Sequence, residues 1–493
     1  MPRTSASAGV SRRTVLRTTA LGALATAAGV TDVDDVFGQA RQAPPNIVYI
    51  MADDLGYADV SCYGRPDFKT PNIDRIAARG VRFLQGYANS AVCSATRTAL
   101  ITGRYQYRLR VGLDEPLAAN AGVGLPPEHP TLPSLLKRAG YGTTLIGKWH
   151  LGWLPTFGPL QSGYDHFYGF RGGGLDYYRH TPGPGPNEDL WDDDMPVHQA
   201  GYLTELLGSR AVDVVNRYAK ARQPFLVSLH FNAPHWPWEA PGDEAESERL
   251  RAENRGLGAY DAGTRKTYQK MVEAMDAQIG RVLKALDDNR LADNTIVIFT
   301  SDNGGERFAM TWPFTGRKTE LLEGGLRIPS IVSWPARIPQ GKTSDQVSIT
   351  MDWLPTLLAA AGTAPDPALP PDGINLLPHL TGTTPPVSRT LYWRYKANAQ
   401  RAMRDGDFKF LKILDNTFLF NVVEDPMERA NLKERRKDLY DQLVAKWLDW
   451  NATMLPEIDE SSTSNFTGAQ MADHIGTPPT SRKADNPAAP PAR

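Results

Sequence analysis

Four short apolar runs, each followed directly by polar or charged residues, constrain the fold of this chain more than any other feature. They lie at 47–51, 143–146, 225–231 and 296–299. Runs of this length that are rich in β-branched or aromatic residues are typical of strands covered on both faces in a parallel sheet. A run at 328–334 predicts a fifth strand. The chain has 493 residues, of which 41% are hydrophobic, and this is enough apolar material for a sizeable core.

Helical patterns separate the runs. The segment from Thr70 to Gly80 has a threonine cap, a proline in the first turn and a terminal glycine. Between Tyr268 and Leu286, apolar residues recur at the helical spacing. This alternation predicts an α/β fold, with a large mixed, mainly parallel sheet flanked by helices. In open sheets of this kind ligands bind beyond the carboxyl ends of the strands, so the polar residues that follow the runs should surround one crevice.

The pattern of predicted secondary structure changes after a proline-rich stretch at 365–371 and a linker at 381–386. Short strand patterns follow, with a turn at Asp405-Gly406, and then a helical pattern over 438–451. The sequence therefore predicts a smaller antiparallel sheet with one helix. The expected divisions are a leader at 1–40, a large domain at 44–380, a C-terminal α+β subdomain at 388–455 and a flexible tail at 461–493.

The first 40 residues are similar to a twin-arginine export signal. Arg12 and Arg13 precede a weakly apolar stretch from Thr18 to Val30, which is too short to span a bilayer. We expect the twin-arginine export machinery as a partner, a periplasmic or extracellular location and no stable membrane anchor. A disordered leader in a cytosolic protein is the alternative. With 54 basic against 55 acidic residues, the charge balance gives no reason to expect nucleic acid as a partner.

Cysteine is scarce, and Cys62 and Cys93 are the two that the sequence contains. Cys93 begins a helical pattern that is closed by Gly103. Free backbone N–H groups favour an anion at the start of a helix, and Arg97, one turn later, could reach the same place. On these grounds alone Cys93 could equally be a buried structural cysteine, or could form a disulfide with Cys62.

The twelve residues from Cys93 to Arg104 resemble the signature of the type I sulfatases, which belong to the alkaline phosphatase superfamily. The matching pattern is Cys93, Ala95 and Arg97, followed by the sequence Ile-Thr-Gly-Arg at 101–104. The resemblance implies that the formylglycine-generating enzyme oxidises the cysteine to formylglycine, or 3-oxoalanine, before folding. The hydrated aldehyde then serves as the nucleophile. Ala95 stands where the family most often has proline, and Thr96 where it most often has serine.

Two further blocks resemble the metal-binding sequences of the family. Asp53 and Asp54 lie in one of them, and Asp302 and Asn303 in the other. The resemblance assigns these residues, together with Cys93, to a Ca²⁺ or Mg²⁺ ion. Three carboxylates and an amide oxygen are hard donors that suit such a cation. Without the other blocks, an aspartate pair at a strand end is more often a turn or a helix cap.

Four more residues match catalytic positions of the family: Lys148, His150, His235 and Lys318. The resemblance implies that Arg97 and the two lysines neutralise the sulfate oxygens, while His235, helped by Lys318, protonates the leaving oxygen. His150 then removes a proton from the second hydroxyl of the hydrated aldehyde, and sulfate is released. The function implied is hydrolysis of aryl or carbohydrate sulfate monoesters to an alcohol and inorganic sulfate.

Two other functions stay open at this point. One is a phosphodiesterase or phosphonate monoester hydrolase of the same superfamily, and the other is an inactive protein that binds sulfated glycans. The substrate is a sulfated small molecule or glycan that the motifs do not specify. Seven of the aromatic residues in the segment from Trp153 to Tyr202 could stack on it from loops near the crevice, or could form a second small core. They are Tyr164, Phe167, Tyr168, Phe170, Tyr177, Tyr178 and Trp191.

Overall fold

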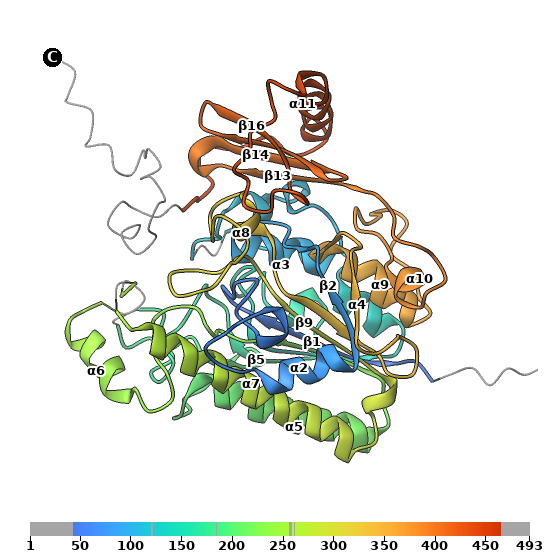
Figure 1. Ribbon diagram of the computed structural model, residues 1–493. Helices are drawn as coiled ribbons and strands as arrows, with labels where there is room; N and C mark the ends of the chain where they lie inside the picture. The colour runs from blue at the N-terminus through green and yellow to red at the C-terminus, as the bar shows by residue number, and fades with distance from the viewer. Residues whose placement is uncertain (1–42, 120–121, 184, 256–258, 261, 465–493) are drawn as a thin grey trace, which may run out of the picture. The chain divides into compact units, whose positions relative to one another are not determined.

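The computed structural model describes residues 43–464, except for 120–121, 184, 256–258 and 261. The predicted leader and the tail beyond residue 464 lie outside the described residues. A ten-stranded sheet forms the centre of the described chain (Figure 1). Its strands, in spatial order, are β11 (Lys342–Ser344), β2 (Gly80–Phe83), β10 (Ser330–Ser333), β9 (Thr295–Ser301), β1 (Asn46–Ala52), β8 (Phe225–His230), β4 (Gly142–Lys148), β5 (His166–Phe170), β6 (Trp191–Asp192) and β7 (Met195–Pro196).

The middle of this sheet is parallel, as the apolar runs predicted. β1 pairs with β9 and with β8, β8 pairs with β4, and β4 pairs with β5, all in parallel register. The fifth predicted strand, β10, is also present, but it runs antiparallel to β9, with Ser330 opposite Thr300. The chain between these strands stays at the carboxyl end of β9, so β10 must start there and run backwards. The sheet is therefore mixed but mainly parallel.

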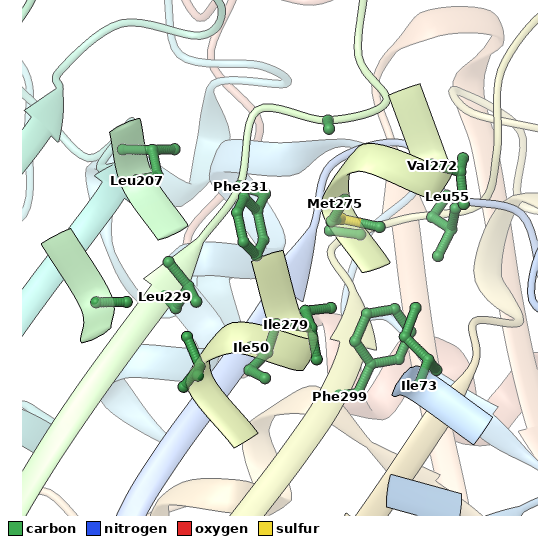
Figure 2. Packing of buried hydrophobic residues seen from close by; sticks show 14 of the residues in the cluster. Ile50, Leu55, Ile73, Leu207, Leu229, Phe231, Val272, Met275, Ile279 and Phe299 are labelled. Carbon is green, nitrogen blue, oxygen red and sulfur yellow. The ribbon is translucent and has the colours of Figure 1, made fainter. Parts of the chain in front are cut away.

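Helices cover both faces of the sheet (Figure 1). One layer contains α2 (Pro71–Ala78), α5 (Leu203–Ala221) and α7 (Arg265–Asp288), and the other contains α3 (Cys93–Thr102), α4 (Leu132–Arg138) and α9 (Trp353–Ala360). Side chains of β1 alternate between the two layers: Ile50 packs with the first, and Tyr49 with the second. Figure 2 shows Met275 and Ile279 of α7 in the first layer, beside Ile50 and Phe299 of the strands.

The C-terminal region forms the predicted antiparallel sheet. Its order is β13 (Thr390–Tyr395), β14 (Gln400–Asp405), β15 (Phe408–Ile413) and β16 (Asn416–Asn421), and α11 (Lys437–Asn451) packs on it. The indole N–H of Trp393 donates to the carbonyl of Ala88 at 2.9 Å, so this sheet contacts the segment before α3. Residues 461–464 pack against the chain near Glu115, because the backbones of Ser462 and Ser464 form hydrogen bonds with the backbone of Glu115.

The remaining elements are short or peripheral. They are β3 (Gly86–Tyr87) paired with β12 (Ser348–Ile349), and the helices α6 (Glu244–Ala252), α8 (Glu323–Leu326) and α10 (Leu377–Leu380). Among the described residues, no helix has the length and apolar character needed to cross a bilayer.

The aromatic segment from Trp153 to Tyr202 does not consist of loops alone. It contributes β5, which is parallel to β4, and the hairpin of β6 and β7. Five of the seven aromatic side chains singled out above are buried in the two helix-covered layers: Tyr164, Phe167, Tyr168, Phe170 and Tyr177. These residues therefore belong to the core and do not form a surface for stacking on a substrate.

Candidate active site

The polar residues that follow the strands lie together at the carboxyl edge of the sheet. Asp53 and Asp54 come directly after β1, and Lys148 is the last residue of β4. Asp302 and Asn303 come directly after β9, while His235 lies five residues beyond the end of β8. All of these side chains are buried. Because neighbouring parallel strands end side by side, residues separated by up to 250 positions in sequence share one site.

Each of the three aspartates is paired with a cation. The carboxylate–cation distances are 2.6 Å for Asp53–Lys148, 2.8 Å for Asp54–Lys318 and 2.8 Å for Asp302–Arg97. Burial opposes ionisation of Asp302, but the charges of Arg97 and Lys148 lower its pKa below the usual range. Burial and the nearby Asp302 carboxylate instead raise the pKa of Asp53. Buried charges with shifted pKa values at the carboxyl edge of such a sheet are typical of functional sites.

Two oxygen atoms in the cluster have no hydrogen-bond partner among the described residues. They are Oδ1 of Asp53 and Oδ1 of Asn303, and both are buried. The amide nitrogen of Asn303 donates to Asp54 at 2.8 Å, so its oxygen is the free end of the side chain. One ligand atom each from Asp53, Cys93 and Asp302 also lies within 4.8 Å of the others. An uncompensated buried oxygen is costly unless a cation or a donor occupies the space beside it.

Cys93 is the first residue of α3, and its side chain is buried within this cluster. Its Sγ atom lies 3.3 Å from Nδ1 of His150. On the other side of that ring, Nε2 lies 2.9 Å from the carbonyl oxygen of Leu117. A carbonyl can only accept, so Nε2 carries the hydrogen, and neutral His150 presents a lone pair to Cys93. Cys62 and Cys93 are both free, which excludes the disulfide between them.

His235 is held in a comparable way, by a backbone carbonyl. Its Nδ1 atom donates to the carbonyl oxygen of Trp236, and its Nε2 atom lies 3.6 Å from a carboxylate oxygen of Asp54. The imidazole stacks on the Trp236 indole at 4.0 Å, and the Lys318 ammonium lies 4.4 Å from the centre of that indole ring. Burial and the charge of Lys318 lower the pKa of His235, and burial and the charge of Lys148 lower that of His150. Both rings are therefore neutral at rest.

Two groups in the site were missed by the sequence analysis. His230, the last residue of β8, lies 3.3 Å from the Arg97 guanidinium through Nδ1, and burial lowers its pKa to about 3. A histidine at the carboxyl end of a predicted strand was a usable signal. The other group is the Leu117 carbonyl, for which no sequence signal exists because any residue supplies one.

Comparison with known families decides what this arrangement belongs to. The family model described as "Sulfatase" matches residues 45–363, and the model "N-sulphoglucosamine sulphohydrolase, C-terminal" matches residues 316–451.

The chain belongs to the sulfatase family.

Named relatives of this sulfatase include two mammalian enzymes. It is 33% identical over 388 residues to N-acetylgalactosamine-6-sulfatase of Canis lupus familiaris, covering 74% of this chain and 71% of the relative. It is also 33% identical to arylsulfatase A of Homo sapiens, over 76% of this chain and 75% of the relative. Among solved structures, that of Ps i-CgsB in complex with k-i-k-neocarrahexaose matches with a TM-score of 0.76 and 30% identity, covering 88% of this chain and 98% of that one.

These relationships establish this sulfatase as a sulfuric ester hydrolase that acts on sulfate monoesters. They also confirm the predicted fold, because the solved neighbours share the large mixed sheet. The phosphonate monoester hydrolase of Agrobacterium radiobacter matches with a TM-score of 0.59 and 22% identity, which shows a shared fold alone.

Proposed function

We propose that this sulfatase cleaves carbohydrate or aryl sulfate esters through a formylglycine formed from Cys93, with a divalent cation bound beside it. The observation that carries the proposal is the placement of Cys93. Its Sγ lies 3.3 Å from Nδ1 of His150, and a ligand atom of Asp53 and one of Asp302 lie within 4.8 Å of it. A buried cysteine with only a structural role would not need a base and two carboxylates as neighbours.

Asp53, Asp54, Asp302 and Asn303 would hold the cation, and the residue at position 93 would complete its ligands. The two buried oxygens without a hydrogen bond, on Asp53 and Asn303, fit this role, and the oxygen-only donor set of the side chains suits Ca²⁺ or Mg²⁺. When bound, such a cation withdraws charge from a sulfate oxygen and from the nucleophile.

Three cations of the chain would neutralise the remaining sulfate oxygens. Arg97, Lys148 and Lys318 are all buried, and each is already held in place by one of the site's aspartates. Held donors of this kind cost little reorganisation when negative charge develops in the transition state.

The two histidines would divide the proton transfers. His150 accepts a proton at Nδ1 from a hydroxyl of residue 93, because its Nε2 hydrogen is held by Leu117. His235 would deliver a proton from Nε2 to the leaving oxygen as an imidazolium. The resting ring is neutral and carries its one hydrogen on Nδ1, at the Trp236 carbonyl, so it must first take up a proton from water at Nε2. Lys318, close to the same indole ring, assists this second transfer.

The substrate class is inferred from relatives. N-acetylgalactosamine-6-sulfatase and a structure that contains a neocarrahexaose are among the proteins that this chain resembles at 30% identity or more. We therefore expect a sulfated sugar as the natural substrate, with activated aryl sulfates as usable substitutes.

Maturation would involve two partners. A formylglycine-generating enzyme would modify Cys93, and the twin-arginine machinery would export the folded protein to the periplasm or beyond. The leader on which the second partner depends, 1–40, lies outside the described residues.

The test combines peptide mass and substrate choice. Active enzyme should yield a Cys93 peptide with the mass of an aldehyde in place of the thiol, and Cys93→Ala should fold but be inactive. A sulfate monoester should be turned over far faster than a phosphate diester with the same leaving group. An unmodified thiol at full activity would refute the nucleophile, and a preference for the diester would favour the phosphorus-directed alternative.

A further inference from the structure

The segment that carries Lys318 is held from outside the large sheet. Gln400, the first residue of β14, lies buried against this segment. Its side-chain oxygen accepts a hydrogen bond from the backbone N–H of Leu321 at 2.8 Å. Its side-chain nitrogen donates to the backbone carbonyl of Thr319 at 2.9 Å. One glutamine of the C-terminal sheet therefore forms hydrogen bonds with the backbone at two positions just after Lys318.

The backbone at Thr319 needs such support. Its φ of 70° lies in the left-handed region, which β-branched residues rarely adopt. Its N–H donates to the carbonyl of Ala91 at 2.9 Å, two residues before Cys93. Unfavourable backbone conformations persist only where the surroundings hold them in place. Here the surroundings are the segment before α3 on one side and Gln400 on the other.

The far end of the same segment is fixed by buried charges. Lys409 of β15 lies 2.9 Å from a carboxylate oxygen of Glu323, and 2.9 Å from one of Glu428. Glu428 in turn accepts from the backbone N–H of Glu323 at 2.6 Å. All three side chains are buried. This anchor holds residue 323, and between it and Lys318 the side chain of Gln400 holds the backbone at residues 319 and 321.

We propose that Gln400 is a positioning residue for catalysis: by fixing the conformation of Thr319, it holds the Lys318 ammonium at Asp54 and beside the leaving-group side of the site. The C-terminal sheet then contributes to catalysis through Gln400 and the backbone segment that follows Lys318. The inference rests on the proposed role of Lys318. Its physical basis is that a change of the Thr319 backbone rotates the preceding peptide unit, and this displaces the Lys318 side chain from its 2.8 Å contact with Asp54.

The chain offers a matched control for Gln400. Gln346 is also buried, and its side chain makes the same set of bonds: it accepts from the N–H of Val387 and donates to the carbonyls of Val347 and Val387. The side chain of Gln400 also has a second carbonyl acceptor, that of Ala397. Replacing either glutamine by alanine therefore removes equivalent hydrogen bonds. Of the two glutamines, Gln400 supports the segment that carries Lys318, and Gln346 does not.

The experiment measures kcat and KM for Gln400→Ala, Gln346→Ala, Lys318→Ala and the double variant Gln400→Ala/Lys318→Ala, with the full chain and two sulfate esters of unequal leaving groups. Gln400→Ala should lower kcat at least about tenfold with little change in KM, and more for the poorer leaving group. Gln346→Ala should lower thermal stability by a similar amount but keep kcat. In the Lys318→Ala background the Gln400 substitution should have no further effect on kcat.

The outcomes separate the inference from the proposed function. If Lys318→Ala retains wild-type kcat, the proposed role of Lys318 is wrong. If Lys318→Ala is impaired but Gln400→Ala keeps wild-type kcat, or the two losses simply multiply in the double variant, Gln400 does not act through Lys318. A Gln400→Ala protein too unstable to assay is replaced by Gln400→Asn. That variant keeps both kinds of polar group on a shorter stem, and should show a kcat between those of wild type and Lys318→Ala.

Discussion

At the scale of single residues, the two histidines of the site are set by backbone carbonyls rather than by carboxylates. Leu117 holds the Nε2 hydrogen of His150, and Trp236 holds the Nδ1 hydrogen of His235. The rings therefore present opposite nitrogens to the reacting groups. A neutral carbonyl orients a ring without raising its basicity as strongly as an anion would, which suits the proton transfers that we propose for these two residues.

The first prediction separates the two histidines by the leaving group. His235→Ala should lose about 10²–10⁴-fold in kcat on a sugar sulfate, but much less on a nitrophenyl sulfate, whose leaving group needs no proton. His150→Ala should lose similar factors on both substrates. His180→Ala, which removes a buried histidine that bonds to Gly201, is the control and should stay active. Equal losses for the His235 variant on both substrates would refute its role as the acid.

The second prediction concerns the cation. Asp302→Asn keeps the shape of the side chain and an oxygen for Arg97, but removes the charge. We expect the purified variant to lose its bound metal and more than about a hundredfold of its activity. This loss exceeds the one typical of residues that only hydrogen-bond to a metal ligand. Elemental analysis and turnover measure both effects. Asp59→Asn, which neutralises another buried aspartate, one paired with Arg65, is the control and should keep its metal.

At the scale of elements, Lys148 depends on how closely β4 and β8 approach. Gly147, the residue before it, has a φ of 105°, and a Cβ there would lie 1.8 Å from the His230 carbonyl oxygen. Only glycine allows the two strands to pair in this register directly beneath the site.

The third prediction follows from that contact. Gly147→Ala should be destabilised by at least about 2 kcal/mol more than Gly140→Ala, and should lose activity. Gly140 also has a positive φ, 89°, but its Cβ would meet nothing within 4 Å, so the pair separates backbone strain from the clash. Chemical denaturation and turnover are the measurements. Equal stability of the two variants would show that the strands separate without cost.

The elements also show what sequence could and could not reveal. The strands around Asp53 and Asp302 were predictable, because residues buried on both faces form continuous apolar runs. That Asp53 and Asp302 lie at the same edge of the sheet was also predictable, because neighbouring parallel strands end side by side. The direction of β10 and the burial of Tyr177 were not predictable, since local pattern does not record which partner an apolar segment finds. Gln400 carries no signal either, because its function comes from a contact with a residue 79 positions away.

At the scale of the whole molecule, Glu115 joins distant parts of the chain. Its side chain accepts from the backbone N–H of Lys396 next to β13, and its backbone pairs with residues 462–464. Burial raises the pKa of Glu115 from 4.5 to about 8. In the pH range between these values the folded protein keeps a proton that the unfolded chain has lost. The free energy of unfolding therefore falls as the pH rises, by about 1.4 kcal/mol per pH unit for this group.

The fourth prediction tests this linkage. Glu115→Gln cannot ionise but keeps an oxygen for Lys396, so its melting temperature should fall less than that of wild type between pH 5 and pH 9. The difference between the two proteins isolates Glu115, because Glu239 and Glu306, whose pKa values are also raised, are present in both. If the melting temperatures of the two proteins instead fall equally between pH 5 and pH 9, Glu115 is ionised in the folded protein.

The burial of Cys93 also sets an order of events during synthesis. Part of the site around it comes from far along the chain, because Lys318 lies 225 positions later. At about 5–20 residues per second, a ribosome needs roughly 10–45 s to reach Lys318 after Cys93 has been made. During that time the cysteine belongs to an open peptide. Afterwards, folding buries the cysteine, so translation provides at least this interval for the oxidation of Cys93 that we propose.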